Sequence, residues 1–151
     1  MAESVSKNKK AFADYEVLET FEAGIVLLGP EVKSIKGHNL NLKGSFIDTD
    51  SKNELWVNGM HISPYKFARD FDINPTRKRK LLLNKKEIHT IVKSITEKGV
   101  TCVPLEVYLK GGMIKLKIAL VRGKKKYDRR DELKKKAQNL EISRALKKFK
   151  K

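Results

Sequence analysis

The sequence is poor in the residues that enzyme centres and cross-links depend on. It has one cysteine in 151 residues, Cys102, which excludes an internal disulfide and a zinc cluster of several thiolates. The three histidines, His38, His61 and His89, are far apart and lack metal-ligand spacing. The chain also lacks a nucleophile elbow, a phosphate-binding loop and an evident pair of acid–base carboxylates. We therefore expect neither an enzyme nor a protein that holds a metal or a cofactor.

Long apolar segments are missing too. No stretch approaches the roughly 20 apolar residues that a helix needs to cross a bilayer. Residues 1–10 have no apolar run of the kind found in a secretory signal. Together with the single cysteine, this pattern predicts a cytoplasmic protein without membrane contact.

Positive charge is abundant and unevenly distributed. The formal net charge is +16, from 34 Lys and Arg against 18 Asp and Glu. Residues 122–151 hold 14 of these cations against 4 acids, a net +10, which leaves +6 for residues 1–121. A moderately basic body with a strongly basic tail is typical of a protein that binds a polyanion, and the absence of a membrane segment favours nucleic acid.

The first half of the chain reads as strands around one short helix. Residues 15–28 predict a long strand that bends near Gly24. A Gly-Pro-Glu start predicts a helix of about two turns, which Gly37 would end in a left-handed conformation. Residues 44–50 and 54–62 flank a Ser-Lys-Asn turn and predict a hairpin.

The second half gives stronger patterns. Asn84 and Glu87 form a capping-box motif that predicts a helix over residues 85–98. Apolar residues alternate over residues 103–109 and again over residues 114–120, on either side of a Lys-Gly-Gly turn. This alternation predicts a second hairpin.

These elements predict a mainly β protein with flanking helices (β+α), in which five or six antiparallel strands form a small closed or partly open barrel. We expect a barrel domain over residues 1–122, with residues 1–10 as a loose basic arm, and a basic tail over residues 123–151. The apolar residues of the tail fall on two different helical faces, and its cations repel one another. We therefore expect a tail that is disordered when free and helical when bound.

Five segments, in this order, resemble the SsrA-binding protein (small protein B) family. They are NKKAF-ADY at 8–15, FEAGI at 21–25, GPEVKSI at 29–35, RKRKLLL at 77–83 and RGKKKYDRR at 122–130. The resemblance covers nearly the whole chain from about Asn8. It implies a β-barrel of the oligonucleotide-binding type.

The resemblance also implies a function in bacterial trans-translation. Members bind the tRNA-like domain of transfer-messenger RNA (tmRNA) near its elbow, and the complex enters the A site of stalled ribosomes. There the protein stands in for the codon–anticodon duplex, with its tail in the decoding centre and the empty mRNA channel, which enables ribosome rescue and tagging of the incomplete peptide. Elongation factor Tu and alanyl-tRNA synthetase become indirect partners through the RNA, and the protein is expected to be monomeric.

The motifs and the distribution of cations give two sets of expected contacts. Residues expected to contact tmRNA are Asn8, Lys10, Tyr15, Glu22, Lys33, Arg77, Arg79, Gly123, Lys124 and Lys125. Residues expected to contact small-subunit rRNA at the decoding centre are Tyr127, Asp128, Arg129, Arg130, Lys134, Lys135 and Lys136. The family's usual lysine after the aspartate is arginine here, at Arg129; the positive charge is kept, but the hydrogen-bond geometry of a lysine does not carry over automatically to an arginine.

Tyr15 can stack on an unpaired base, whereas Glu22 cannot bind phosphate. The Glu22 carboxylate can accept hydrogen bonds from base amino groups or a 2′-hydroxyl and so add selectivity, although by pattern alone it is a solvated strand residue. For Glu31 the stronger interpretation is stabilisation of a helix N-terminus. The alternative to the rescue function is a general rRNA-binding or ribosome-assembly protein with the same barrel and basic tail.

Overall fold

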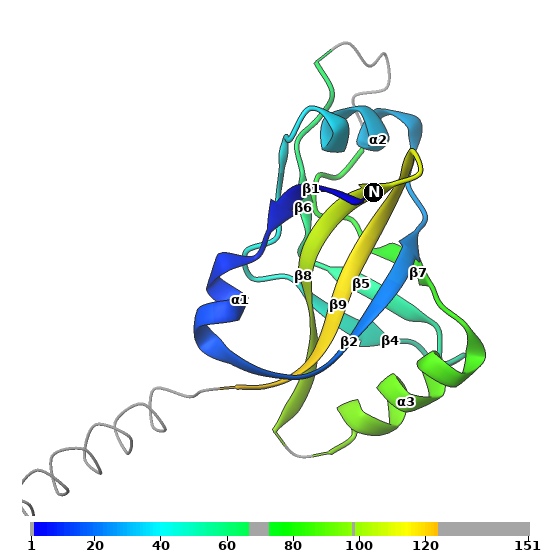
Figure 1. Ribbon diagram of the computed structural model, residues 1–151. Coiled ribbons are helices and arrows are strands. Elements are labelled where there is room, and N and C mark those ends of the chain that lie inside the picture. The colour runs from blue at the N-terminus through cyan, green and yellow to red at the C-terminus, as the bar shows by residue number, and fades with distance from the viewer. Residues whose placement is uncertain (1, 67–72, 98, 124–151) are drawn as a thin grey trace, which may run out of the picture.

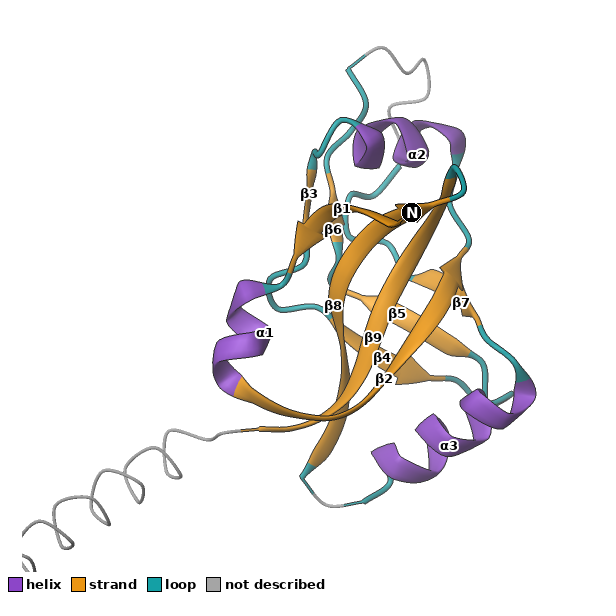
Figure 2. Cartoon of the chain, viewed as in Figure 1, coloured by secondary structure: helices purple, strands orange, loops and turns teal. Residues whose placement is uncertain are grey.

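A computed structural model describes residues 2–66, 73–97 and 99–123. Its strands form a curved sheet, and three helices lie around the rim of that sheet (Figures 1 and 2). The tail residues Lys124, Lys125, Tyr127, Asp128, Arg129, Arg130, Lys134, Lys135 and Lys136 lie outside the described residues. No helix among the described residues has the length and apolarity to span a membrane.

Six antiparallel strands close into a ring, which confirms the mainly β prediction. The hydrogen-bonded order is β8-β4-β5-β7-β2-β9, and β9 pairs again with β8. The bounds of these strands are β2 Tyr15–Ile25, β4 Phe46–Thr49, β5 Leu55–Asn58, β7 Arg79–Leu82, β8 Val100–Lys110 and β9 Met113–Gly123. The long strands β2, β8 and β9 form one wall, and the short strands β4, β5 and β7 form the wall opposite (Figure 2).

Both predicted hairpins are present, although the strand expected over residues 54–62 ends at Asn58. β8 and β9 pair from Val100↔Arg122 to Lys110↔Met113, and Gly111 and Gly112 both take positive φ between them. That geometry is the one in which a two-residue turn matches the twist of its strands. β4 and β5 pair around a turn in which Asp50 Oδ1 accepts hydrogen bonds from the backbone N–H groups of residues 52 and 54.

The expected loose arm at residues 1–10 is wrong for the described residues 2–10. β1 (Ala2–Lys7) pairs antiparallel with the Glu106–Lys110 half of β8, and α1 (Lys9–Asp14) follows at once. The arm was expected to be loose because its local sequence is polar. Its order comes from a partner strand about one hundred residues away, which local pattern cannot reveal.

The second helix, α2 (Gly29–Lys36), confirms the predicted start but not the predicted end. Gly37 has φ −85°, and it is His38 that takes the left-handed conformation at φ 61°. The His38 ring compensates for that uncommon backbone, because Nδ1 lies 3.0 Å from the Val5 carbonyl oxygen of β1. Two short strands, β3 (Leu40–Asn41) and β6 (His61–Ile62), pair beneath α2.

The third helix, α3 (Lys85–Ile95), begins with the predicted capping box. Asn84 Oδ1 accepts from the Glu87 N–H at 2.9 Å, and the Glu87 carboxylate accepts from the Asn84 N–H. The helix ends three residues earlier than expected. Its apolar stripe packs against one end of the barrel, where Ile91 is fully buried. The same core holds Cys102, and burial raises the pKa of its thiol to about 12, so the thiol stays protonated and inert as a strand residue.

Candidate functional site

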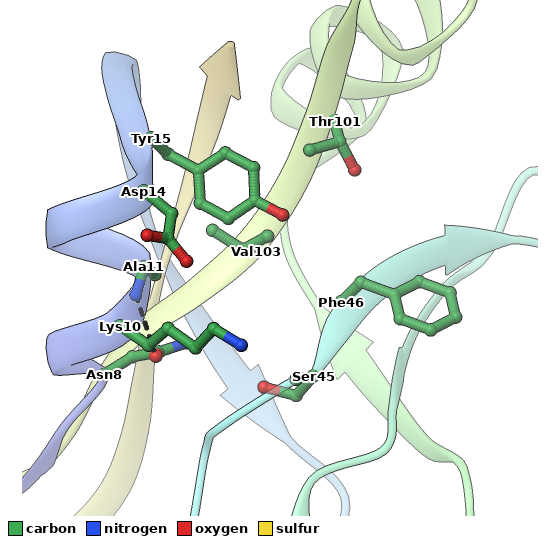
Figure 3. A pocket seen from close by; sticks show the side chains of 10 residues that line it. Asn8, Lys10, Ala11, Asp14, Tyr15, Ser45, Phe46, Thr101 and Val103 are labelled. Carbon is green, nitrogen blue, oxygen red and sulfur yellow. Dashed lines mark hydrogen bonds between the residues drawn. The ribbon is translucent and has the colours of Figure 1, made fainter. Parts of the chain in front are cut away.

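A pocket of about 390 Å³ lies where α1 meets the start of β2. Its floor is apolar, from Ala11 of α1 and Val103 of β8, which are 3% and 2% exposed. Lys10 and Tyr15 point into it, and Phe46 of β4 lines the far side (Figure 3). The sequence analysis expected RNA contacts from Lys10, Tyr15 and Asn8, and the structure brings these three together at this pocket.

Asn8 is only 4% exposed and fixes the position of α1. Its Oδ1 accepts from the Ala11 N–H at 3.1 Å as the helix N-cap, and its Nδ2 donates to the carbonyls of Pro104, at 2.9 Å, and Leu42. The Pro104 carbonyl lies where β8 shifts register against β9, between Pro104 and Glu106. The side chain is therefore engaged within the protein, and its expected RNA contact stays a prediction.

Tyr15 and Gly123 are cross-strand neighbours at the ends of β2 and β9. A Cβ on Gly123 would lie 3.6 Å from Cε1 of the Tyr15 ring, which is ordinary van der Waals contact. Gly123 is therefore not required by the packing of Tyr15. The bare backbone beside the ring is open to a close approach from outside the protein.

Glu22 lies seven residues further along β2, outside the pocket. Its register partner is Lys117 of β9, and Lys117 in turn pairs with Glu106 of β8. The Lys110 Nζ is 3.3 Å from Glu22 Oε2. A hydrogen bond from the Tyr108 hydroxyl, with smaller contributions from lysines, outweighs the cost of desolvation and lowers the pKa of Glu22 below its ordinary value.

Glu22 is thus an exposed, ionised carboxylate surrounded by cations on the outer wall of β2, β9 and β8. Lys110, Lys115 and Lys117 project from this wall, and the first two lower the pKa of Glu22. Tyr108 lies underneath and is only 7% exposed. Burial is the largest cause that raises the pKa of its hydroxyl, and the hydrogen bond to Glu22 raises it further, so the hydroxyl stays protonated and donates. The wall combines two carboxylate acceptors, Glu22 and Glu106, with several lysine ammonium groups.

The expected RNA contact of Arg79 is wrong, because its side chain is fully buried. Its guanidinium donates to Glu31 Oε2 at 2.7 Å and to the backbone carbonyls of Met60 and Pro75. Arg77 also donates to the Glu31 carboxylate, at 2.5 and 3.1 Å, and remains 29% exposed. These contacts join α2 to β7.

Glu31 is the centre of this ion cluster. Burial alone raises the pKa of Glu31, but hydrogen bonds from Arg77, the Leu28 N–H and Arg79 outweigh it and hold the pKa below its ordinary value. The bond from the Leu28 N–H is 2.9 Å long and satisfies a free donor at the start of α2. On the same helix, Lys33 Nζ lies 5.3 Å from the centre of the Tyr65 ring, a cation–π contact.

Sequence reasoning missed Tyr108, Lys110 and the Glu31 cluster. Tyr108 and Lys110 belong to the alternating pattern of a strand, and nothing local shows that they reach a carboxylate 86 and 88 residues away. The residues of the described chain form no group of three or more His, Cys, Asp or Glu suited to a metal ion.

Comparison with known proteins gives a consistent result. A family model described as "SmpB protein" matches residues 5–148. The "SsrA-binding protein" of Bacillus cytotoxicus is 50% identical over 93% of this chain and 90% of its own length. The "SsrA-binding protein" of Lactococcus lactis subsp. cremoris is 48% identical over 96% of this chain and 93% of its own length. A solved chain from "tmRNA-SmpB: a journey to the center of the bacterial ribosome" is 38% identical and superimposes with a TM-score of 0.63, covering 83% of this chain and 85% of its own.

Proposed function

The chain belongs to the SmpB family of SsrA-binding proteins, and we propose on that basis that it binds the tRNA-like domain of tmRNA in trans-translation. The observation that carries the proposal is near-full-length identity of about 50% to proteins named for binding SsrA RNA. The protein acts by binding RNA rather than by catalysis.

The proposed RNA surface runs along β2 from the pocket at Tyr15 to Glu22. Lysines on the outer wall neutralise phosphates, which gives affinity for any structured RNA. Glu22 gives selectivity, because a carboxylate held by Tyr108 and Lys110 still has lone pairs for a base amino group or a 2′-hydroxyl. Asn8 acts by positioning α1, and Arg79 by supporting the fold.

The remaining contacts are assigned by family position. Gly123 allows a close approach of the RNA backbone, and residues 124 and 125 add charge. Residues 123–151 form a second module, which enters the decoding centre and the empty mRNA channel of a stalled ribosome. The protein thereby delivers tmRNA to the A site and works in the cytoplasm as a monomer, with elongation factor Tu and alanyl-tRNA synthetase as indirect partners through the RNA.

Binding titrations with single variants separate this function from general rRNA binding. We expect Glu22→Ala to weaken binding to the tRNA-like domain while binding to an rRNA fragment of equal length is unchanged or tighter. The matched control is Glu19→Ala, which removes the same charge from an exposed position of the same strand, on the face opposite to Glu22 and so outside the proposed RNA surface. General electrostatic binding predicts that both variants bind every RNA slightly more tightly, since each removes a negative charge.

Truncation separates the two modules. A chain ending at residue 127 keeps the whole barrel, and we expect it to bind the tRNA-like domain with unchanged affinity. It should fail to support peptide tagging on stalled ribosomes in a reconstituted translation reaction. Equal loss of both activities would contradict the division into an RNA-binding barrel and a ribosome-binding tail.

A further inference from the structure

A groove of about 320 Å³ lies between α3 and the turn that joins β4 to β5. Its floor is apolar and consists of Ile88 and Val92 of α3, which pack against the barrel core and remain half-buried. Lys52 from the turn and Lys85 and His89 from the helix are exposed and form its rim. The groove shares no residue with the proposed RNA surface.

The lining of the groove repeats along the axis of α3. Ile88 and Val92 are four residues apart and therefore form one apolar row on the helix surface. Lys85, His89 and Lys93 have the same spacing and form an exposed row beside it. Residues four apart rise by about 6 Å along a helix, so the groove can follow a partner segment over more than one turn.

The other side of the groove is held in place by the turn. Asp50 Oδ1 accepts hydrogen bonds from the backbone N–H groups of residues 52 and 54, at 3.0 and 2.9 Å, and Asn53 takes a positive φ of 58°. Asp50 Oδ2 accepts a further hydrogen bond from the Trp56 indole at 2.9 Å. The backbone that carries Lys52 is therefore fixed before any partner arrives.

Two cations of the rim are not neutralised by the described part of the chain. Glu54 also lines the groove, but its carboxylate pairs with Lys80 at 3.3 Å. Among the described residues, the ammonium groups of Lys52 and Lys85 have neither an ion pair nor a hydrogen bond. The groove thus combines an apolar floor with unpaired positive charge.

Charge and polarity together restrict the occupant. A second copy of this chain, at net +16, or its own tail, at net +10 over residues 122–151, would bring like charge to Lys52 and Lys85. Phosphate groups alone would make no use of the apolar floor. A base pressed against Ile88 and Val92 would leave its polar edge without hydrogen bonds.

We propose that this groove docks a partner protein through an acidic segment that carries an apolar side chain. The apolar side chain inserts between Ile88 and Val92, and acidic residues on either side of it pair with Lys52 and Lys85. This site goes beyond RNA binding, because it lets the protein hold a second protein on a part of its surface that the RNA does not use.

The experiment is an NMR titration of the ¹⁵N-labelled full chain with end-blocked peptides. The probe is Glu-Glu-Leu-Glu-Glu, and it should shift the backbone amide signals of residues 88, 89 and 92 until they saturate. Lys-Lys-Leu-Lys-Lys should leave these signals unchanged. Glu-Glu-Gly-Glu-Glu should bind there about tenfold more weakly, because it keeps the charge but buries no leucine side chain.

Variants of the groove separate its two features. Lys52→Gln and Lys85→Gln should each weaken binding of the probe by about 1.5- to 5-fold, the effect of losing one exposed ion pair. Val92→Thr keeps the shape of the floor but adds a hydroxyl, and it should weaken binding by about 2- to 10-fold. The matched control is Lys86→Gln, an exposed lysine of the same helix that does not line the groove, and its affinity should be unchanged. Thermal unfolding of each variant verifies the fold.

Four outcomes would overturn the proposal. One is the absence of saturable shifts at residues 88, 89 and 92 with the probe at millimolar concentration. Another is equal affinity for the leucine and glycine peptides, or equal effects of Lys52→Gln and Lys86→Gln, either of which would indicate charge alone. Tighter binding of an RNA oligonucleotide at these residues would assign the groove to RNA, and shifts that depend on protein concentration without peptide would assign it to a second copy. In each case selective binding of tmRNA elsewhere on the protein would still stand.

Discussion

Replacing Glu31 with glutamine tests the assignment of the ion cluster to the fold rather than to RNA. The substitution keeps the size of the side chain but leaves the Arg79 guanidinium, which is fully buried, without its counter-charge. It also directs amide hydrogens at two guanidinium groups that are themselves donors only.

The structure sets the magnitude. Removal of one partner from a buried ion pair costs about 3–5 kcal/mol, and the low exposure of Glu31 and Arg79 places this pair in that class. For a chain of this size the loss lowers the melting temperature by roughly 10 °C. The matched control is Glu54→Gln, whose partner Lys80 is 38% exposed, and there we expect a change below about 1 kcal/mol.

The dependence on pH gives a second check. The pKa of Glu31 is lower in the folded protein than in the unfolded chain. Its contribution to stability is therefore present above the unfolded pKa and is lost as the pH falls through the folded pKa. The free energies of unfolding of wild type and Glu31→Gln, measured in urea, should differ most near pH 7. The difference should shrink in acid, below the ordinary carboxyl pKa. A small difference at pH 7, or one that persists unchanged in strong acid, would refute the reasoning.

Three further substitutions test other parts of the account. Tyr108→Phe removes the hydroxyl that holds Glu22, so the pKa of Glu22 should rise towards its ordinary value in an NMR titration of its carboxyl carbon; an unchanged titration contradicts the contact. Gly123→Ala adds a Cβ in ordinary contact with Tyr15, so the free energy of unfolding should change by less than about 1 kcal/mol, while the affinity for RNA falls. Unchanged affinity would argue against a close approach of RNA to the Gly123 backbone. Ile91→Ala should cost roughly 2–5 kcal/mol in urea unfolding, and a cost near zero would show that α3 does not close the core.

Local rules were sufficient where one stretch of chain contains both halves of an interaction. The hairpin of β8 and β9 follows from alternation and two glycines, and the start of α3 from Asn84 and Glu87, three residues apart. Local rules failed where the partner is distant. β1 pairs with β8, and α1 is anchored to the Pro104 carbonyl of β8 through its N-cap Asn8, both about one hundred residues away. Arg79 is buried because α2 supplies its counter-charge 48 residues away.

The candidate site shows the same division. Motif resemblance selected Tyr15 and Glu22, but it did not show that one lies at a pocket and the other on the outer wall of the barrel. Arg77 and Arg79, from the run of four cations at residues 77–80, were expected to contact RNA. Alternation along β7 instead turns Arg79 inwards and Lys80 outwards. Side-chain direction in a strand depends on register, and register is fixed by pairing rather than by composition.

The most direct test of the central claim is a competition measurement. Full-length protein bound to the labelled tRNA-like domain of tmRNA is challenged, at physiological salt, with unlabelled tmRNA, an elongator tRNA and an rRNA fragment of matched length. The account predicts displacement by tmRNA at concentrations at least tenfold below those of the other two, and loss of this preference in Glu22→Ala. Equal displacement by all three RNAs would contradict it.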